Sequence, residues 1–287
     1  MRRRFSGGVG RRPLFLALVL IFLFASACKT TKDAAAAATQ LNTAATKLAA
    51  YYDDLSAQLD DTVRLNELQA AFYPIPFTDA DRAPILEVKS EIGKRAAMAH
   101  SLANLATAYG NLAGSTASAD ASTAASSLAN ELQTAKALPQ GSAIPDIAGE
   151  AAKLLVTFAQ TRSLKAGAVG VNNAVGAVST IFDGEEKAYE SIQKQRLALA
   201  RQIAVKLVDT HDIEINFPDL VEPATKPFSL SPKTPDVGDD PKYLQLVKSG
   251  IDDQVQEQER QYADSTESLS ASLHAVYGAI ERIAKQK

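Results

Sequence analysis

Apolar side chains recur at intervals of three and four residues along most of the chain, which is the pattern of amphipathic α-helices. Leu41, Leu48 and Leu55 lie seven residues apart within a proline-free stretch. This spacing predicts a long helix over residues 33–71, which ends at the turn Tyr73-Pro-Ile-Pro76 because proline cannot continue a helix. By the same pattern we expect further helices over residues 81–114, 122–138, 146–164 and 166–208.

A last helix is predicted to open at Asp239-Asp240-Pro241, where acidic residues precede a proline at the first helical position. Its apolar positions alternate three and four residues apart for most of its length, as coiled-coil packing requires. They are Leu244, Val247, Ile251, Val255, Tyr262, Leu269, Leu273, Val276, Ile280 and Ile283.

Residues 213–240 hold five prolines and predict an extended strap between the last two helices. An extended proline-rich segment covers about 3.1 Å per residue. The strap is therefore long enough to let the last helix run either parallel or antiparallel to its predecessor.

Composition agrees with a helical fold, because aromatic residues make up 6% of the chain and tryptophan is absent. The sequence predicts an all-α fold, an elongated bundle of five or six long helices with coiled-coil-like seams. Residues 33–212 would form the bundle, 213–240 the proline-rich strap, and 241–287 a C-terminal long helix that packs on the bundle.

The first 27 residues have the organisation of an export signal. Five arginines and no acid precede a charge-free apolar run from Leu14 to Phe24. The run has about 11 residues, whereas a membrane-spanning helix needs roughly 20. It ends in the small residues Ala25-Ser26-Ala27, so a cleavable signal is favoured over a permanent anchor.

Ala25-Ser26-Ala27-Cys28 resembles the lipobox of bacterial lipoproteins, although Ala25 stands where leucine is commonest. This resemblance covers residues 1–28 only. It implies cleavage before Cys28, acylation of the thiol, and a short lipidated tether over residues 28–32. The alternative is an ordinary secretory signal cut after Ala27.

Loss of the signal would leave 25 basic and 33 acidic residues, a net charge of −8. Such a surface repels nucleic acid and anionic lipid, so membrane attachment would depend on the acyl chains. Cys28 is the only cysteine, so no intrachain disulfide is expected. Because Lys29 follows it where aspartate would favour inner-membrane retention, the family rule favours the periplasmic face of the outer membrane.

We expect no catalytic residue, cofactor site or metal site. The chain lacks the glycine-rich phosphate loop, G-x-S-x-G and H-E-x-x-H motifs. The group Asp209-Thr-His211-Asp212-Ile-Glu214 offers carboxylates and one histidine, but too few nitrogen ligands at fixed spacing for zinc. A polar helix end is the simpler interpretation.

Three segments are candidates for contact with other molecules. Phe72, Tyr73 and Phe77 form an aromatic, proline-locked turn that either caps the bundle or presents a contact surface. The proline-rich strap either lies along the helices or binds a partner as an extended peptide. The apolar segment 166–182, rich in small residues, either packs between helices or inserts into lipid.

These patterns predict a lipid-anchored helical protein of the bacterial cell envelope that acts as a non-enzymatic scaffold or binding module. Its partners would be membrane lipid, through acylated Cys28, and an envelope protein or a second copy of the chain, with no nucleic acid. The alternative is a membrane-active protein that inserts residues 166–182 into lipid, as helical pore-forming toxins insert concealed apolar segments.

Overall fold

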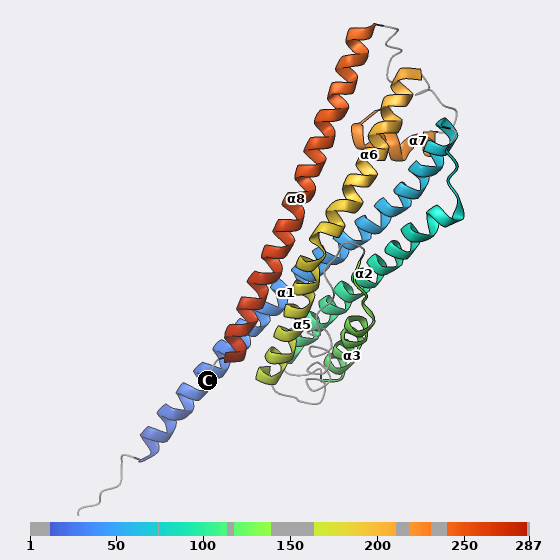
Figure 1. Ribbon diagram of the computed structural model, residues 1–287. Helices are drawn as coiled ribbons and strands as arrows, with labels where there is room; N and C mark the ends of the chain where they lie inside the picture. Colours follow the sequence, from blue (N-terminus) through green and yellow to red (C-terminus); the bar gives the residue numbers. More distant parts are fainter. Residues whose placement is uncertain are drawn as a thin grey trace, which may run out of the picture.

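The computed structural model describes residues 12–73, 75–113, 118–138, 164–210, 218–230 and 240–285. Within these ranges all regular elements are helices and there is no strand, which confirms the predicted all-α fold. The helices form an elongated bundle (Figure 1). They are α1 (Arg12–Phe72), α2 (Asp79–Ala113), α3 (Ser118–Thr134), α5 (Leu164–Gly184), α6 (Glu186–Thr210), α7 (Pro218–Thr225), the 3₁₀ helix η2 (Lys226–Phe228) and α8 (Pro241–Lys285).

Helix α1 is longer than predicted at its N-terminal end. It begins at Arg12 rather than near residue 33 and ends at Phe72, one residue beyond the expected stop. No glycine or proline occurs between residues 14 and 38, so nothing interrupts the helix where the apolar run meets the alanine-rich segment. Residues 28–32, expected as a separate tether, are therefore part of this helix.

Helices α1 and α2 form an antiparallel pair. The Asn42 side chain donates to the carbonyl of Ala103 at 3.1 Å, and further along α1 the Asp60 carboxylate pairs with Lys89 at 2.6 Å. At the start of α2 the Asp81 carboxylate accepts hydrogen bonds from the amide and hydroxyl of Thr78. These bonds satisfy donors that a helix N-terminus leaves free.

The predicted continuous helix over residues 166–208 is interrupted at Glu185, which lies in a turn between α5 and α6. Helix α6 runs parallel to α1, while α8 runs antiparallel to α6 (Figure 1). Two ion pairs fix that direction, Asp209 with Lys248 and Arg201 with Asp252, each at 2.5 Å. The length of the connection allows α8 to run parallel or antiparallel to α6, and the protein adopts the antiparallel arrangement.

Two hydrophobic cores lie along the bundle. The larger one is built from α1, α2, α3, α5, α8 and the start of α6. The smaller one lies at the end where α1 meets α2, and it includes Val221 and Ala224 of α7 and Phe228 of η2. Residues 218–228 are therefore helical, and Val221, Ala224 and Phe228 are buried against the bundle, whereas an extended strap was expected there. Residues 213–217 and 231–239 of the predicted strap lie outside the described ranges. So do residues 146–163 of the helix predicted over 146–164.

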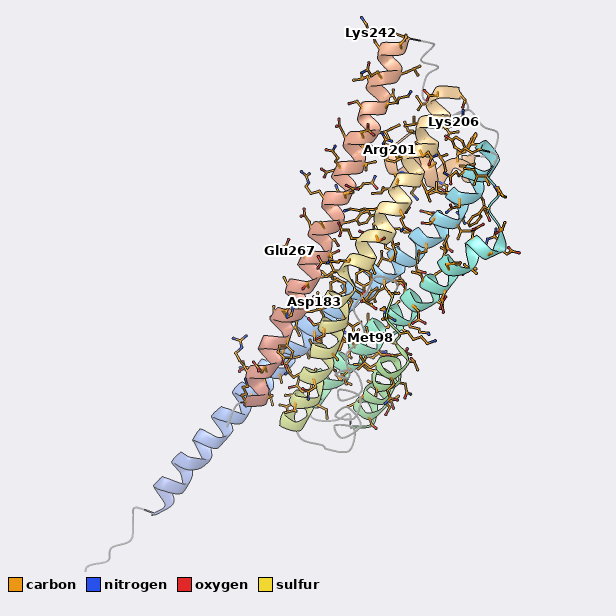
Figure 2. All side chains as sticks on the ribbon, viewed as in Figure 1. Met98, Asp183, Arg201, Lys206, Lys242 and Glu267 are labelled. Carbon is orange, nitrogen blue, oxygen red and sulfur yellow. The ribbon has the colours of Figure 1, made fainter. Side chains whose placement is uncertain are left out.

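The predicted seam of α8 packs to different depths along its length. Ile251, Leu269, Leu273, Val276, Ile280 and Ile283 are buried, whereas Leu244, Val247, Val255 and Tyr262 are half-buried. The first turns of α8 extend past the end of α6, near Lys242 (Figure 2), where fewer helices are available to cover them. The C-terminal half of α8 therefore contributes most of its core packing.

Two glycines of α2 provide a matched test of the close packing between α1 and α2. A Cβ added at exposed Gly93 would meet nothing within 4 Å, but one at Gly110 would lie 3.2 Å from the Cβ of Ala38. Gly93→Ala should raise the free energy of unfolding by about 0.5–1 kcal/mol, since alanine stabilises a helix interior. Gly110→Ala should raise the free energy of unfolding by a smaller amount or lower it, as measured by urea denaturation. An equal gain at both positions would contradict this close approach.

Candidate functional site

The candidate lipidation residue, Cys28, falls in the first part of α1, and its side chain is outside the described part of the structure. The N-terminal turns of α1 project beyond the other helices (Figure 1). The first buried side chain described in α1 is that of Ala34. Among the described residues, no helix combines the length and apolarity needed to cross a membrane.

The aromatic turn between α1 and α2 is only partly exposed. Phe72 packs against the smaller core, and the Arg82 guanidinium lies 5.7 Å from the centre of the Phe77 ring, a cation–π contact. Tyr73 is half-buried. Among the described residues of this turn, Ile75 is the exposed large apolar side chain, at 59%.

The apolar segment 166–182 lies inside α5 and packs in the larger core. Its buried side chains come from every turn of the helix, while Val169 is exposed on the opposite face. At Gly176 an added Cβ would lie 3.0 Å from the Tyr277 ring of α8. The small residues of this segment therefore allow close packing between α5 and α8 in the folded protein.

A buried arginine joins α2 to the turn between α5 and α6. Arg95 is 0% exposed, and its Nη2 and Nε donate to the two carboxylate oxygens of Glu185 at 2.6 and 3.0 Å. Its Nη1 also contacts Glu91 at 3.3 Å, and its Nη2 donates to the carbonyl of Lys136. The amide of Leu138 donates to Glu185 at 3.1 Å. This Arg95 cluster connects α2, the segment after α3 and the turn at Glu185.

The charges of the Arg95 cluster are maintained by its hydrogen bonds. Burial opposes ionisation of Arg95, but its bonds to Glu185 raise its pKa. Burial likewise works against the Glu91 carboxylate, but hydrogen bonds from Lys94 and from the Lys136 amide hold its pKa below the ordinary value. Every charged group of the cluster faces an opposite charge or a backbone dipole, which is the condition for a buried ion pair to be tolerated.

Four aromatic rings pack beside the Arg95 cluster. Tyr189 donates to Glu185 at 2.8 Å and lies 3.1 Å from the hydroxyl of Tyr52. Tyr51 and Phe182 complete the group, with ring centres 5.6–6.3 Å apart and mostly edge-to-face geometry. Such edge contacts add to the free energy of ring burial. The rings join α1, α5 and α6 around the ion pair.

A serine, a histidine and an aspartate meet between α5 and α8, but not in the order of a catalytic triad. Ser270 donates to Asp183 at 2.7 Å, and Nε2 of His274 lies 2.9 Å from the same carboxylate. In a triad the histidine lies between nucleophile and carboxylate. Here the carboxylate lies between the other two, so the group connects helices and does not activate the serine.

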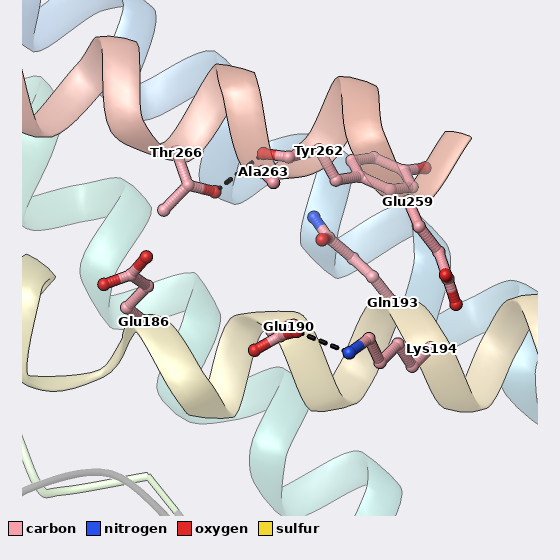
Figure 3. Close-up of a pocket in the computed structure, with 8 residues that line it drawn as sticks. All are labelled: Glu186, Glu190, Gln193, Lys194, Glu259, Tyr262, Ala263 and Thr266. Carbon is pink, nitrogen blue, oxygen red and sulfur yellow. Dashed lines mark hydrogen bonds and ion pairs between the residues drawn. The ribbon is translucent and has the colours of Figure 1, made fainter. Parts of the chain in front are cut away.

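A polar groove of about 230 Å³ lies between α6 and α8 (Figure 3). Carboxylates and one buried amide dominate its lining, and it contains one lysine, whose Nζ pairs with Glu190 at 2.5 Å. The α6–α8 groove is lined by Glu186, Glu190, Gln193, Lys194, Glu259, Tyr262, Ala263 and Thr266.

The described residues contain no group of three or more histidine, cysteine, aspartate or glutamate side chains placed to hold a metal ion. The helix-end cluster considered from the sequence lies only partly within the described ranges. Its Asp209 pairs with Lys248, while residues 211–214 are outside them.

Sequence patterns missed the Arg95 cluster, although one signal was present. Arg95 lies three residues after Ile92 and four before Ala99, so it falls on the apolar stripe of α2. A charged residue on a core-facing stripe requires a buried partner. Its partner, Glu185, is 90 residues away in the chain, and no local pattern connects the two.

No protein-family model matches the chain, and neither the curated proteins nor the solved structures include a significant match to it.

Removal of one member of the buried ion pair should strongly destabilise the fold. Arg95→Met leaves the Glu185 carboxylate buried and unpaired, and should lower the free energy of unfolding by about 3–5 kcal/mol. Arg95→Met combined with Glu185→Leu should cost clearly less than the sum of the single changes. Lys285→Met, in the exposed pair with Glu281, should change stability by no more than about 0.5 kcal/mol. Additive losses in urea denaturation would contradict the pairing.

Alkaline titration should separate buried from exposed tyrosines. Burial raises the pKa of Tyr51 and of Tyr109 to about 12, and those of Tyr52 and Tyr189 are also raised. The unfolded chain loses these protons near pH 10, so stability is complete below pH 10 and falls as pH rises toward 12. Tyrosinate absorbance should show only part of the eight tyrosines ionising before helicity is lost. Ionisation of all eight near pH 10 in a still-helical protein would contradict their burial.

Proposed function

We propose that this protein is a lipid-anchored helical protein of the bacterial cell envelope and acts as a non-enzymatic scaffold or binding module. The lipobox-like sequence that ends at Cys28 supports the anchor. Cleavage before Cys28 would remove the first part of α1 and leave a helix that begins at the acylated residue. Membrane lipid and an envelope protein, or a second copy of the chain, are the proposed partners.

The observation that carries this proposal is the position of the exposed apolar side chains relative to Cys28. From Cys28 to Phe72, an α-helix spans roughly 66 Å at 1.5 Å per residue. At the end of the bundle opposite the N-terminal turns of α1 lie the α1–α2 turn and the first turns of α8 (Figure 1). These carry exposed Ile75 and Leu246, at 59% and 67%. A rigid α1 would hold this distal end away from the anchoring membrane.

The proposal favours a binding role over the membrane-active alternative because the segment that would insert into lipid, residues 166–182, is packed in the larger core. Its C-terminal end is next to Glu185, which the Arg95 cluster holds. Release of α5 into lipid would expose that ion pair and remove Phe182 from its contacts with Tyr51, Tyr52 and Tyr189. The retained ion pairs and ring contacts therefore support a bundle that keeps α5 in place.

Site-specific photo-crosslinking in the native host tests both parts of the proposal. A photoreactive residue at position 75 or 246 should capture one discrete envelope protein, or a second copy of the chain, because these side chains present apolar surface at the distal end. The same residue at Ser265, exposed midway along α8, is the matched control and should capture neither.

Cys28→Ser should release the protein from the membrane fraction and abolish the crosslinked product, since both depend on the acyl anchor. Intact-mass analysis of the mature protein should find acylated Cys28 as its first residue. Products equal in yield at positions 75, 246 and 265, or a Cys28→Ser protein that still fractionates with membranes, would overturn the proposal.

A further inference from the structure

A polar layer lies between the two hydrophobic cores. On α1, no residue of either core lies between Leu59 and Leu65. Beside this gap the Gln58 amide donates to the Tyr262 hydroxyl of α8 at 3.0 Å, and Arg196 of α6 pairs with Asp61 of α1 at 3.3 Å. At this level the three helices are therefore joined mainly by polar contacts and not by a continuous core.

Helix α8 passes through the polar layer without a buried side chain. From residue 252 to residue 265 every side chain is half-buried or exposed, whereas Ile251 before this stretch and Thr266 after it are buried. The stretch is about 21 Å long at 1.5 Å per residue. The two ends of α8 thus pack in different cores, and the part that connects them adds little apolar burial to either.

The N-terminal part of α8, residues 241–258, is held against the bundle mainly by surface contacts. Ile251 is its only buried side chain. Two ion pairs link it to α6, and all four side chains are at least 37% exposed. They are Arg201–Asp252 and Asp209–Lys248. Exposed ion pairs contribute little to stability, and salt weakens them further. Separation of this part therefore costs less than separation of the C-terminal part, whose apolar seam is buried in the larger core.

The same N-terminal part of α8 covers the smaller core. The side chains that it supplies to that core are Leu244, Val247, Ile251 and Val255. Gln258 also donates a hydrogen bond to a carbonyl of η2. Separation would expose this apolar seam and the surface of α6 and η2 that it contacts.

We propose that residues 241–258 form a lid, the α8 lid, which opens from the smaller core while residues 266–285 stay packed in the larger core. The polar layer is the boundary at which α8 unwinds. Helices of this length depend on tertiary packing for most of their stability, so the open lid loses its backbone hydrogen bonds. The closed and open states differ in the apolar surface of the distal end. Opening needs no partner and does not depend on the proposed scaffold role.

Hydrogen exchange of the purified full-length protein in a neutral detergent, resolved along α8 by mass spectrometry, tests the lid. Protection factors of residues 246–258 should share one low value, because a lid opens as a cooperative unit. Those of residues 269–280 should be at least about tenfold higher, because these amides exchange only when the larger core opens.

Salt should act on the lid alone. An increase in NaCl from about 0.05 M to about 0.5 M should lower lid protection about two- to fivefold, because it screens the two ion pairs with α6. Protection of residues 269–280 should stay unchanged.

Two glycines of α8 provide matched variants. A Cβ added at Gly250 of the lid, or at Gly278, would meet nothing within 4 Å, so alanine at either position stabilises the helix without a new contact. Gly250→Ala should raise lid protection about two- to fivefold. Gly278→Ala should leave lid protection unchanged, because residue 278 stays helical when the lid opens.

A second pair of variants tests the contact with α6. Asp252→Asn should lower lid protection about twofold or more, because it weakens the bond to Arg201. Asp253→Asn is the same change at the exposed neighbouring residue and should have little effect.

Four results would overturn the lid. The first is one protection factor along the whole of α8. The second is a gradual rise in protection from residue 246 to residue 280, which indicates fraying from the helix end. The others are equal gains in lid protection in Gly250→Ala and Gly278→Ala, and equal losses in Asp252→Asn and Asp253→Asn.

Discussion

The buried ion pair between Arg95 and Glu185 is the interaction on which the arrangement of the bundle depends. A guanidinium group with no exposed surface is tolerated only where a carboxylate and backbone acceptors surround it. Those partners come from three separate parts of the chain: α2, the segment after α3 and the turn between α5 and α6. The register of α2 against α5 is therefore restricted to the one that brings these groups together.

This constraint accounts for the interruption between α5 and α6. Glu185 is placed in a turn, where its carboxylate reaches Arg95 and its neighbours start a new helix. Tyr189, one turn into α6, donates to the same carboxylate, and the rings of Tyr51, Tyr52 and Phe182 pack around it. An apolar core alone would allow these helices to slide along one another, whereas directional bonds to a buried charge select one alignment.

The constraint also gives a physical meaning to the apolar, small-residue composition of α5. In the sequence this composition is compatible with lipid or with a protein core. In the folded chain, small side chains bring α5 close to α8, as at Gly176 against Tyr277, and Asp183 extends that contact to Ser270 and His274. Polar groups at the C-terminal end of α5 thus pair with protein side chains on two sides.

Local patterns in the sequence were sufficient to predict much of the fold. Proline and capping residues marked the end of α1 and the starts of α2 and α8 to within a few residues, because these signals act on the adjacent backbone. Two expectations were wrong for the same reason. The break at Glu185 and the helical turn of residues 218–228 depend on contacts with distant helices, which override local preference.

The candidate sites were harder to anticipate than the helices. Cys28 was identified from a short local motif, the lipobox-like sequence, which can be recognised without knowledge of the fold. Its acylation remains a prediction. The Arg95 cluster and the α6–α8 groove each combine residues from distant parts of the chain, so they become visible only when the helices are assembled. Arg95 on an apolar stripe was the one local sign that a charge would be buried.

Hydrogen exchange of the α5 amides, measured by mass spectrometry with and without liposomes, tests the central claim most directly. If α5 is a core helix held by the Arg95 cluster, its amides should exchange slowly in the free protein, and liposomes should not alter that rate. Rapid exchange of α5 in the free protein, or protection that appears only with liposomes and is accompanied by leakage of their contents, would contradict the account.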